Sequence, residues 1–81
     1  MNAGATNDLL NHLAECLIVD RKRLSAETAA GDIEAWDSMG LVEIVFMLQR
    51  EYGVSVPPEN AGKLNSVPAI IEVLTAAGKL A

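Results

Sequence analysis

The residues best placed for chemistry in this sequence are Asp37 and Ser38, which begin its most regular helical stretch. The hydroxyl of Ser38 could carry a phosphate ester, because the unpaired amides and the positive dipole end of a helix N-terminus stabilise a negative group. Gly40 lies within the first turn and leaves little side-chain bulk beside such an ester. The structural alternative is that either residue simply caps the helix, since serine and aspartate are common caps.

The other reactive side chains do not form a catalytic set. Cys16 is the only cysteine and His12 the only histidine, so the chain cannot build a disulfide or a cysteine zinc site of its own. Cys16 falls in an apolar helical pattern, which favours a small core residue over a reactive thiol. We therefore expect no catalytic residues and no metal site, and the sequence indicates that the protein is not an enzyme.

The net charge of −5 is concentrated in the middle third of the chain. Residues 31–60 contain six acidic residues and one basic residue, whereas the remainder contains equal numbers of each. This distribution argues against nucleic acid and anionic membranes as partners and favours basic protein surfaces, although it could also serve solubility alone. Neither a membrane span nor a signal peptide is recognisable, so we expect a cytoplasmic location.

The length and the periodicity predict one domain, residues 1–81, built from helices. Residues 1–6 are expected to be a flexible N-terminus, and helices are predicted over about 7–19, 38–52, 58–63 and 67–77. The first helix has an apolar stripe of Leu9, Leu10, Leu13, Leu17 and Ile18. The fold class is therefore all-α, a small monomeric four-helix bundle with a long loop between the first two helices. Leu24 and Ile33 should anchor that loop in the core.

The second predicted helix has two apolar faces. One is an ordinary core stripe of Leu41, Ile44, Val45, Leu48 and Tyr52. The opposite side carries Met39, Glu43, Phe46, Met47 and Arg50, where a solvated face should be polar. Either the helix packs against neighbours on both sides, or the two methionines and the phenylalanine form an exposed patch that docks partners.

The run Trp36-Asp37-Ser38-Met39-Gly40-Leu41-Val42-Glu43 resembles the Asp-Ser-Leu motif of acyl and peptidyl carrier proteins. Its continuation through Leu48, Glu51, Tyr52, Gly53, Val54 and Val56-Pro57 is similar to the conserved tail of that family, and Ser66-Val67 with Ile70-Ile71 resembles its fourth helix. The resemblance covers about residues 7–77. On this basis the chain is identified as a member of the carrier family, of the free-standing type.

The resemblance implies a specific cofactor and specific partners. Ser38 would bear 4′-phosphopantetheine, transferred from coenzyme A by a separate phosphopantetheinyl transferase, and Asp37 would help to present Ser38 to that enzyme. Met39, Glu43, Phe46 and Met47 lie where carriers contact partner enzymes. Those partners would be a loading enzyme, either adenylating or acyl-transferring, and downstream synthase enzymes that accept the thioester-bound cargo.

Departures from the family pattern bear on the pathway. Met39 stands for the usual leucine, and Gly40, Gln49 and Arg50 stand where fatty-acid carriers tend to be acidic. The less acidic surface favours a polyketide or nonribosomal peptide pathway, with a D-alanyl or fatty-acid-type carrier as the alternative. A different class also remains open, an unmodified helical interaction module that uses the patch around Phe46 without a prosthetic group.

Overall fold

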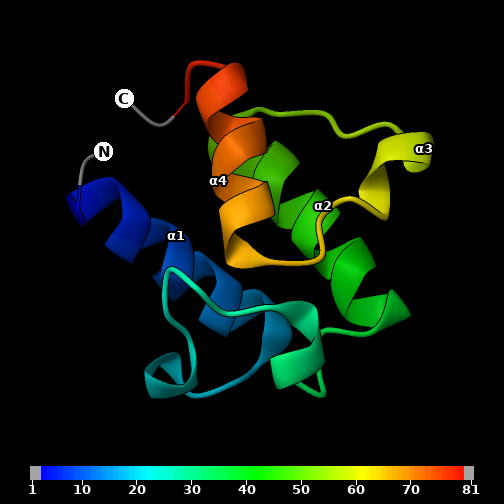
Figure 1. The fold of residues 1–81 in the computed structure, drawn as a ribbon. Helices are drawn as coiled ribbons and strands as arrows, with labels where there is room; N and C mark the ends of the chain where they lie inside the picture. Colours follow the sequence, from blue (N-terminus) through cyan, green and yellow to red (C-terminus); the bar gives the residue numbers. More distant parts are fainter. Residues whose placement is uncertain (1–2, 80–81) are drawn as a thin grey trace.

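The fold is described here from a computed structural model, which describes residues 3–79. Within these residues four helices follow one another: α1 (Ala3–Leu17), α2 (Ser38–Tyr52), α3 (Pro58–Ala61) and α4 (Val67–Ala76). Two short 3-10 turns, η1 (Arg21–Arg23) and η2 (Ala30–Asp32), lie in the connection between α1 and α2 (Figure 1). The predicted four-helix bundle with a long first loop is confirmed.

Helix α1 begins earlier than the sequence predicted. We expected it to start at about Asn7, after a flexible segment, but the helix already includes Ala3 and runs through Thr6. Alanine has the highest intrinsic helix propensity, and Ala5 packs against the core, so this segment gains by joining the helix. The predicted start of the helix at about Asn7 was therefore wrong, while residues 1–2 of the segment expected to be flexible lie outside the described part of the chain.

The end of α1 contains an unusual residue, Ile18. Its φ is +55°, in the left-handed region that β-branched residues rarely adopt, and its side chain is 90 % exposed. The amide of Val19 donates to the carbonyl of Ala14 over 3.0 Å, a bond of the kind that closes a helix C-terminus. The prediction that Ile18 extends the core stripe was wrong, because α1 ends at Leu17 and the left-handed backbone of Ile18 leaves its side chain in solvent.

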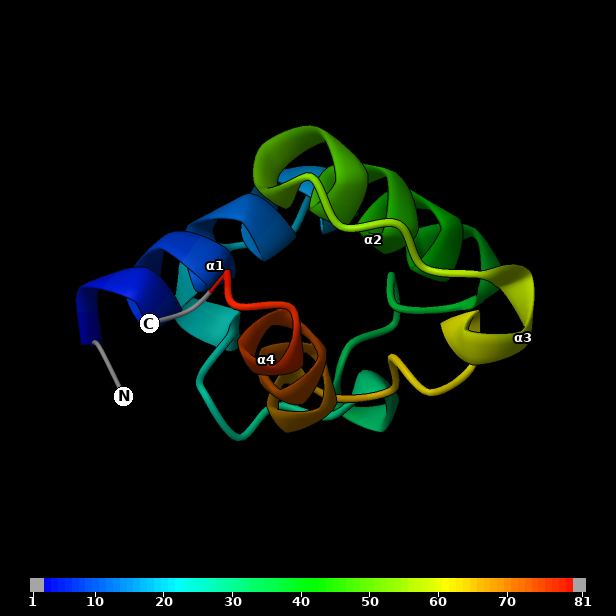
Figure 2. The same ribbon diagram turned by 90° about the horizontal axis from the view of Figure 1, so that it is seen from above.

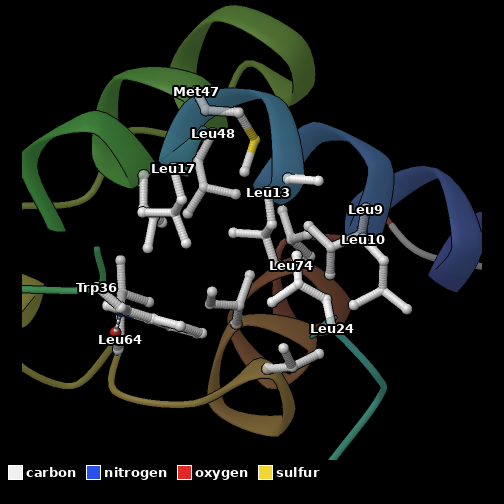
Figure 3. Close-up of a cluster of buried hydrophobic side chains, with 14 of the residues drawn as sticks. Leu9, Leu10, Leu13, Leu17, Leu24, Trp36, Met47, Leu48, Leu64 and Leu74 are labelled. Carbon is white, nitrogen blue, oxygen red and sulfur yellow. Dashed lines mark hydrogen bonds between the residues drawn. The ribbon is translucent and has the colours of Figure 1, made fainter. Parts of the chain in front are cut away.

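The core lies where α1, α2 and α4 meet. Figure 2 shows α4 nearly end-on beside the pair of α1 and α2, with α3 at the outer side of α2. The side chains that fill this space are almost entirely aliphatic (Figure 3). Each fully buried side chain of this size stabilises the fold by roughly 1.5–3 kcal/mol relative to exposure. Those with essentially no exposure are Leu9, Leu13, Ile44, Met47, Leu48, Leu64, Val67, Ile70 and Leu74.

The long loop is tied to the connection between α3 and α4. The amide of Ala30 donates to the carbonyl of Asn65 and the amide of Val67 donates to the carbonyl of Thr28, both over 2.8 Å. Leu24 and Ile33 are buried, which confirms the prediction that they anchor the loop. The loop thus crosses the lower end of the bundle in Figure 1 and arrives at a defined place for the start of α2.

Candidate functional site

The start of α2 leaves the hydroxyl of Ser38 free. Asp37 is the N-cap, and its Oδ1 accepts a hydrogen bond of 2.9 Å from the amide of Gly40. The carbonyl of Asp37 accepts from the amide of Leu41 over 2.8 Å. Ser38 is therefore the first residue of the helix rather than its cap. It is exposed, and its hydroxyl makes no hydrogen bond within residues 3–79.

The surroundings of Ser38 suit a phosphate ester. The amides of Ser38 and Met39 belong to the first turn and have no hydrogen-bond partner among the described residues. The helix dipole adds a partial positive charge at the same place, so an ester here would be stabilised by both effects. The residues at this position thus fit a phosphorylated prosthetic group.

Ser66, a second serine at a helix N-terminus, differs from Ser38 because it is itself the N-cap. It precedes α4, and its own hydroxyl accepts a hydrogen bond of 3.1 Å from the amide of Ala69. The side chain of Ser66 is therefore committed to capping and is only partly exposed. At the start of α2, Asp37 caps the helix instead, and the hydroxyl of Ser38 is therefore available at the helix N-terminus.

Trp36 fixes the approach of the loop to this site. Its indole Nε1 donates a buried hydrogen bond of 3.1 Å to the carbonyl of Leu64, drawn as a dashed line in Figure 3. Beside Ser38 lies a hollow of about 170 Å³ between the start of α2 and the connection that precedes α4. Its walls are Ala30, Trp36, Asp37, Ser38, Leu41, Gly62, Leu64 and Asn65.

Position 40 requires a glycine for a structural reason that the sequence did not indicate. We expected its missing side chain to keep bulk away from Ser38, but Gly40 is buried on the opposite side of the helix. A Cβ there would lie deep inside the van der Waals radius of the Ala35 carbonyl oxygen and 3.0 Å from Cδ2 of Leu17. The glycine therefore allows the loop and α1 to approach α2 closely.

The exposed side of α2 contains most of the predicted partner surface. Met39 is 77 % exposed and Phe46 is 57 % exposed, and Glu43 lies between them in sequence and is also exposed. Met47, in contrast, is only 1 % exposed, so its assignment to the partner surface was wrong. The reason is that α1 packs against this side of α2 and covers Met47. The alternative in which α2 packs against neighbours on both sides thus explains why Met47 is buried, but Met39 and Phe46 are exposed.

Sequence reasoning missed Val42, which is 51 % exposed and one turn before Phe46. Both residues line an apolar cleft of about 260 Å³ between α2 and α3, together with Leu41, Val45, Val56, Pro58 and Ala61. The signal was present in the sequence, because residues four positions apart share a helix face. We name the exposed set Met39, Val42, Glu43 and Phe46 the α2 surface.

The remaining reactive groups lie away from Ser38 and are not activated. Burial raises the pKa of the Cys16 thiol to about 11, and the nearby Glu43 carboxylate acts in the same direction. A thiol with such a pKa is protonated at neutral pH and is a poor nucleophile. His12 packs edge-on against the ring of Tyr52, with the ring centres 5.7 Å apart.

Within the described residues no helix is of a length and hydropathy suited to crossing a bilayer.

Comparisons with known proteins indicate the family of the chain. Residues 7–74 match the family model described as "Phosphopantetheine attachment site". The chain is 33 % identical over 67 residues to the acyl carrier protein of Bdellovibrio bacteriovorus, a match that covers 83 % of this chain and 86 % of that protein. It is 35 % identical over 63 residues to the acyl carrier protein of Thermosynechococcus vestitus, which covers 76 % of each chain. No solved structure matches the chain.

Proposed function

This chain belongs to the acyl carrier protein family, whose cofactor is a covalently attached 4′-phosphopantetheine, and from that premise we propose that Ser38 is its attachment residue. The observation that carries the proposal is the division of roles at the start of α2. Asp37 caps the helix through its carboxylate, so the adjacent Ser38 hydroxyl stays exposed and unbonded beside two available amides.

The attachment step uses Ser38 as the nucleophile. Its Oγ forms a bond to the phosphorus that bears the pantetheine arm of coenzyme A, and the bond from that phosphorus to the bridging oxygen of the pyrophosphate breaks. Adenosine 3′,5′-bisphosphate leaves, and the hydroxyl proton passes to the transferase. Asp37 contributes by holding the first turn in place, so that Ser38 is presented to the enzyme on a rigid helix end. The attached group then supplies a terminal thiol that carries the cargo as a thioester.

In this role the protein is a substrate of its partners and not a catalyst. A carrier has to bind several enzymes in turn and leave each of them, which requires small interfaces and fast association. The α2 surface is suited to this, because it places three apolar side chains around Glu43 within the acidic third of the chain. We propose that it docks the transferase, the loading enzyme and the downstream enzymes, and that these present basic residues toward it.

We further propose that the pathway is polyketide or nonribosomal peptide synthesis. Its support is the modest acidity of the docking region, where Gln49 and Arg50 follow the α2 surface and Arg50 pairs with Glu51 over 3.1 Å. A fatty-acid-type carrier is the second candidate, favoured by the relatives that are named acyl carrier proteins. Loading of the phosphopantetheinylated chain by an amino-acid-adenylating enzyme, but not by a fatty-acid malonyl transferase, would support the nonribosomal peptide pathway over the fatty-acid one.

The attachment residue is tested by intact mass. The purified chain is incubated with coenzyme A, Mg²⁺ and a broad-specificity phosphopantetheinyl transferase, beside Ser38→Ala and Ser66→Ala. Ser66 is the matched control, since it too is a serine at a helix N-terminus. We expect a gain of one phosphopantetheinyl group in the parent and in Ser66→Ala, and none in Ser38→Ala. A gain in Ser38→Ala, with that variant folded, would refute the assignment.

A further inference from the structure

Ile18 is an exposed apolar residue for which the fold alone gives no reason. Its side chain is 90 % exposed, more than any other large hydrophobic side chain in the described part of the chain. Its φ of +55° is one that a β-branched residue rarely adopts, whereas glycine or asparagine adopts it at lower cost. An isoleucine at this position therefore lowers the stability of the isolated protein, and its exposed side chain adds little to the core. Backbone outliers that persist in this way are concentrated at binding and active sites.

The position of Ile18 is fixed by hydrogen bonds on both sides of it. Its own amide donates to the carbonyl of Glu15 over 3.3 Å. Three residues further on, the guanidinium of Arg21 donates to the side-chain oxygens of Asn7 and Asn11, over 2.8 Å and 3.1 Å, and holds the following turn against α1. The isoleucine side chain is thus presented on an ordered backbone, which reduces the loss of freedom when a partner binds it.

Ile18 lies at the same end of the bundle as Ser38. Figure 1 shows α1 ending and α2 beginning at the lower end of the bundle. The two ends meet where Leu17 lies against Gly40, since a Cβ on Gly40 would be 3.0 Å from Cδ2 of Leu17. Ile18 directly follows Leu17, and Met39 directly precedes Gly40. The two most exposed large apolar residues of the described chain, Ile18 and Met39, therefore adjoin one contact beside Ser38.

An enzyme that modifies Ser38 has to cover this end of the molecule. A specific interface of standard size buries about 800 Å² on each partner. The chain exposes 4843 Å² in all, so such an enzyme covers about a sixth of the carrier surface around Ser38. The charge of this area is also defined, because the pKa of the Cys16 thiol on α1 is raised first by burial and then by the Glu43 carboxylate, which places Glu43 beside α1. The partner that fits is an enzyme with an apolar recess bordered by basic residues.

Building on the proposed function, we propose that Ile18 is a docking residue for the phosphopantetheinyl transferase, so that the surface which this enzyme recognises extends from the α2 surface onto the end of α1. In the complex, the side chain of Ile18 is buried in an apolar recess of the transferase and Glu43 faces basic residues. Ile18 acts on binding and takes no part in bond formation at Ser38. Its removal therefore raises KM and leaves kcat little changed.

The test measures the kinetics of transfer to two Ile18 variants. The parent, Ile18→Gly and Ile18→Leu are incubated with coenzyme A, Mg²⁺ and a broad-specificity phosphopantetheinyl transferase, and initial rates at several carrier concentrations are followed by intact mass. We expect kcat/KM of Ile18→Gly to fall about tenfold through KM, as for the loss of one buried aliphatic side chain. Ile18→Leu keeps an apolar side chain and should retain most of the parent value. A parent value in Ile18→Gly, or an equal loss in both variants, would overturn the proposal.

Melting temperature and size in solution separate docking from other roles of Ile18. Ile18→Gly should melt at or above the parent temperature, because glycine adopts a positive φ without strain, so slower transfer would not reflect unfolding. Slower transfer together with a lower melting temperature would assign Ile18 to the fold and overturn the proposal. Unchanged transfer with a smaller size in solution would assign it to contact between two copies of the chain, and would also overturn it. Failure of the proposed function would look different, because the mass gain would then persist in Ser38→Ala.

Discussion

Replacing Gly40 by alanine should destabilise the protein, although the same change favours most helices. In a helix interior, alanine is better than glycine by about 1 kcal/mol. At Gly40 the added Cβ would overlap the Ala35 carbonyl oxygen and would lie 3.0 Å from Leu17 Cδ2. The carbonyl is part of the backbone and cannot rotate away as a side chain would. Overpacking of this kind costs about 1–3 kcal/mol and occasionally more.

Because the added Cβ meets backbone, the upper end of this range, about 3 kcal/mol, applies, and the net loss is about 2 kcal/mol. This loss corresponds to a fall in melting temperature of about 8–16 °C for a domain of this size. Movement of Ala35 would also disturb Trp36 and Asp37, so phosphopantetheine transfer should slow. The assay is thermal unfolding followed by circular dichroism. Gly62→Ala is the matched control, because Gly62 has a helical φ of −64° and open space around its Cα. A Gly40→Ala protein that melts at or above the parent temperature would refute this reasoning.

Three further outcomes follow from the burial and backbone of single residues. Met47→Ala should lower the free energy of unfolding by about 2–5 kcal/mol, because this side chain is in the core. Phe46→Ala, on the exposed side of α2, should change it by less than about 0.5 kcal/mol. Unfolding in urea measures both values, and similar losses for the two variants would contradict the structure. Ile18→Gly should raise the melting temperature, since relief of the left-handed conformation is worth about 1–2 kcal/mol and little buried area is lost; a fall would show that the strain is absent. Cys16 should react with iodoacetamide at pH 8 far more slowly in the folded than in the urea-unfolded protein, and equal alkylation rates would contradict its burial. Because folding raises the pKa of this thiol from 9.0 to about 11, the free energy of unfolding should decline as the pH rises from about 9 to about 11.

The bounds of α2 could be predicted because the sequence has a recognisable signal at each end of the helix. A capping residue stands at the start, and Gly53, with φ of +67°, stands at the end where a left-handed residue closes the helix. The sequence left open whether Asp37 or Ser38 is the cap. The cap is the residue whose side chain reaches the amide of Gly40, and only the three-dimensional structure shows that this is Asp37. The identity of the cap in turn decides whether the Ser38 hydroxyl is available.

The errors arose where neighbouring elements decide burial. A helical projection separates Met47 from the main core stripe, but it cannot show that α1 covers that side of α2. In the same way, Ile18 continues the apolar pattern of α1, but the pattern does not show that the helix stops at Leu17. The start at Ala3 was missed because polar residues capable of capping, from Thr6 onward, lie inside the helix. Periodicity therefore predicted the elements well, but not all of their contacts.

The most direct test of the central claim is to locate the prosthetic group on the protein as isolated from cells that contain a phosphopantetheinyl transferase. Trypsin cleaves after Arg23 and Arg50, which gives a peptide of residues 24–50 that contains Ser25 and Ser38, while Ser55 and Ser66 fall in other peptides. Fragmentation of that peptide separates its two serines. We predict that phosphopantetheine is found on Ser38 alone. Its presence on another residue, or its absence from a fully folded sample, would contradict the assignment.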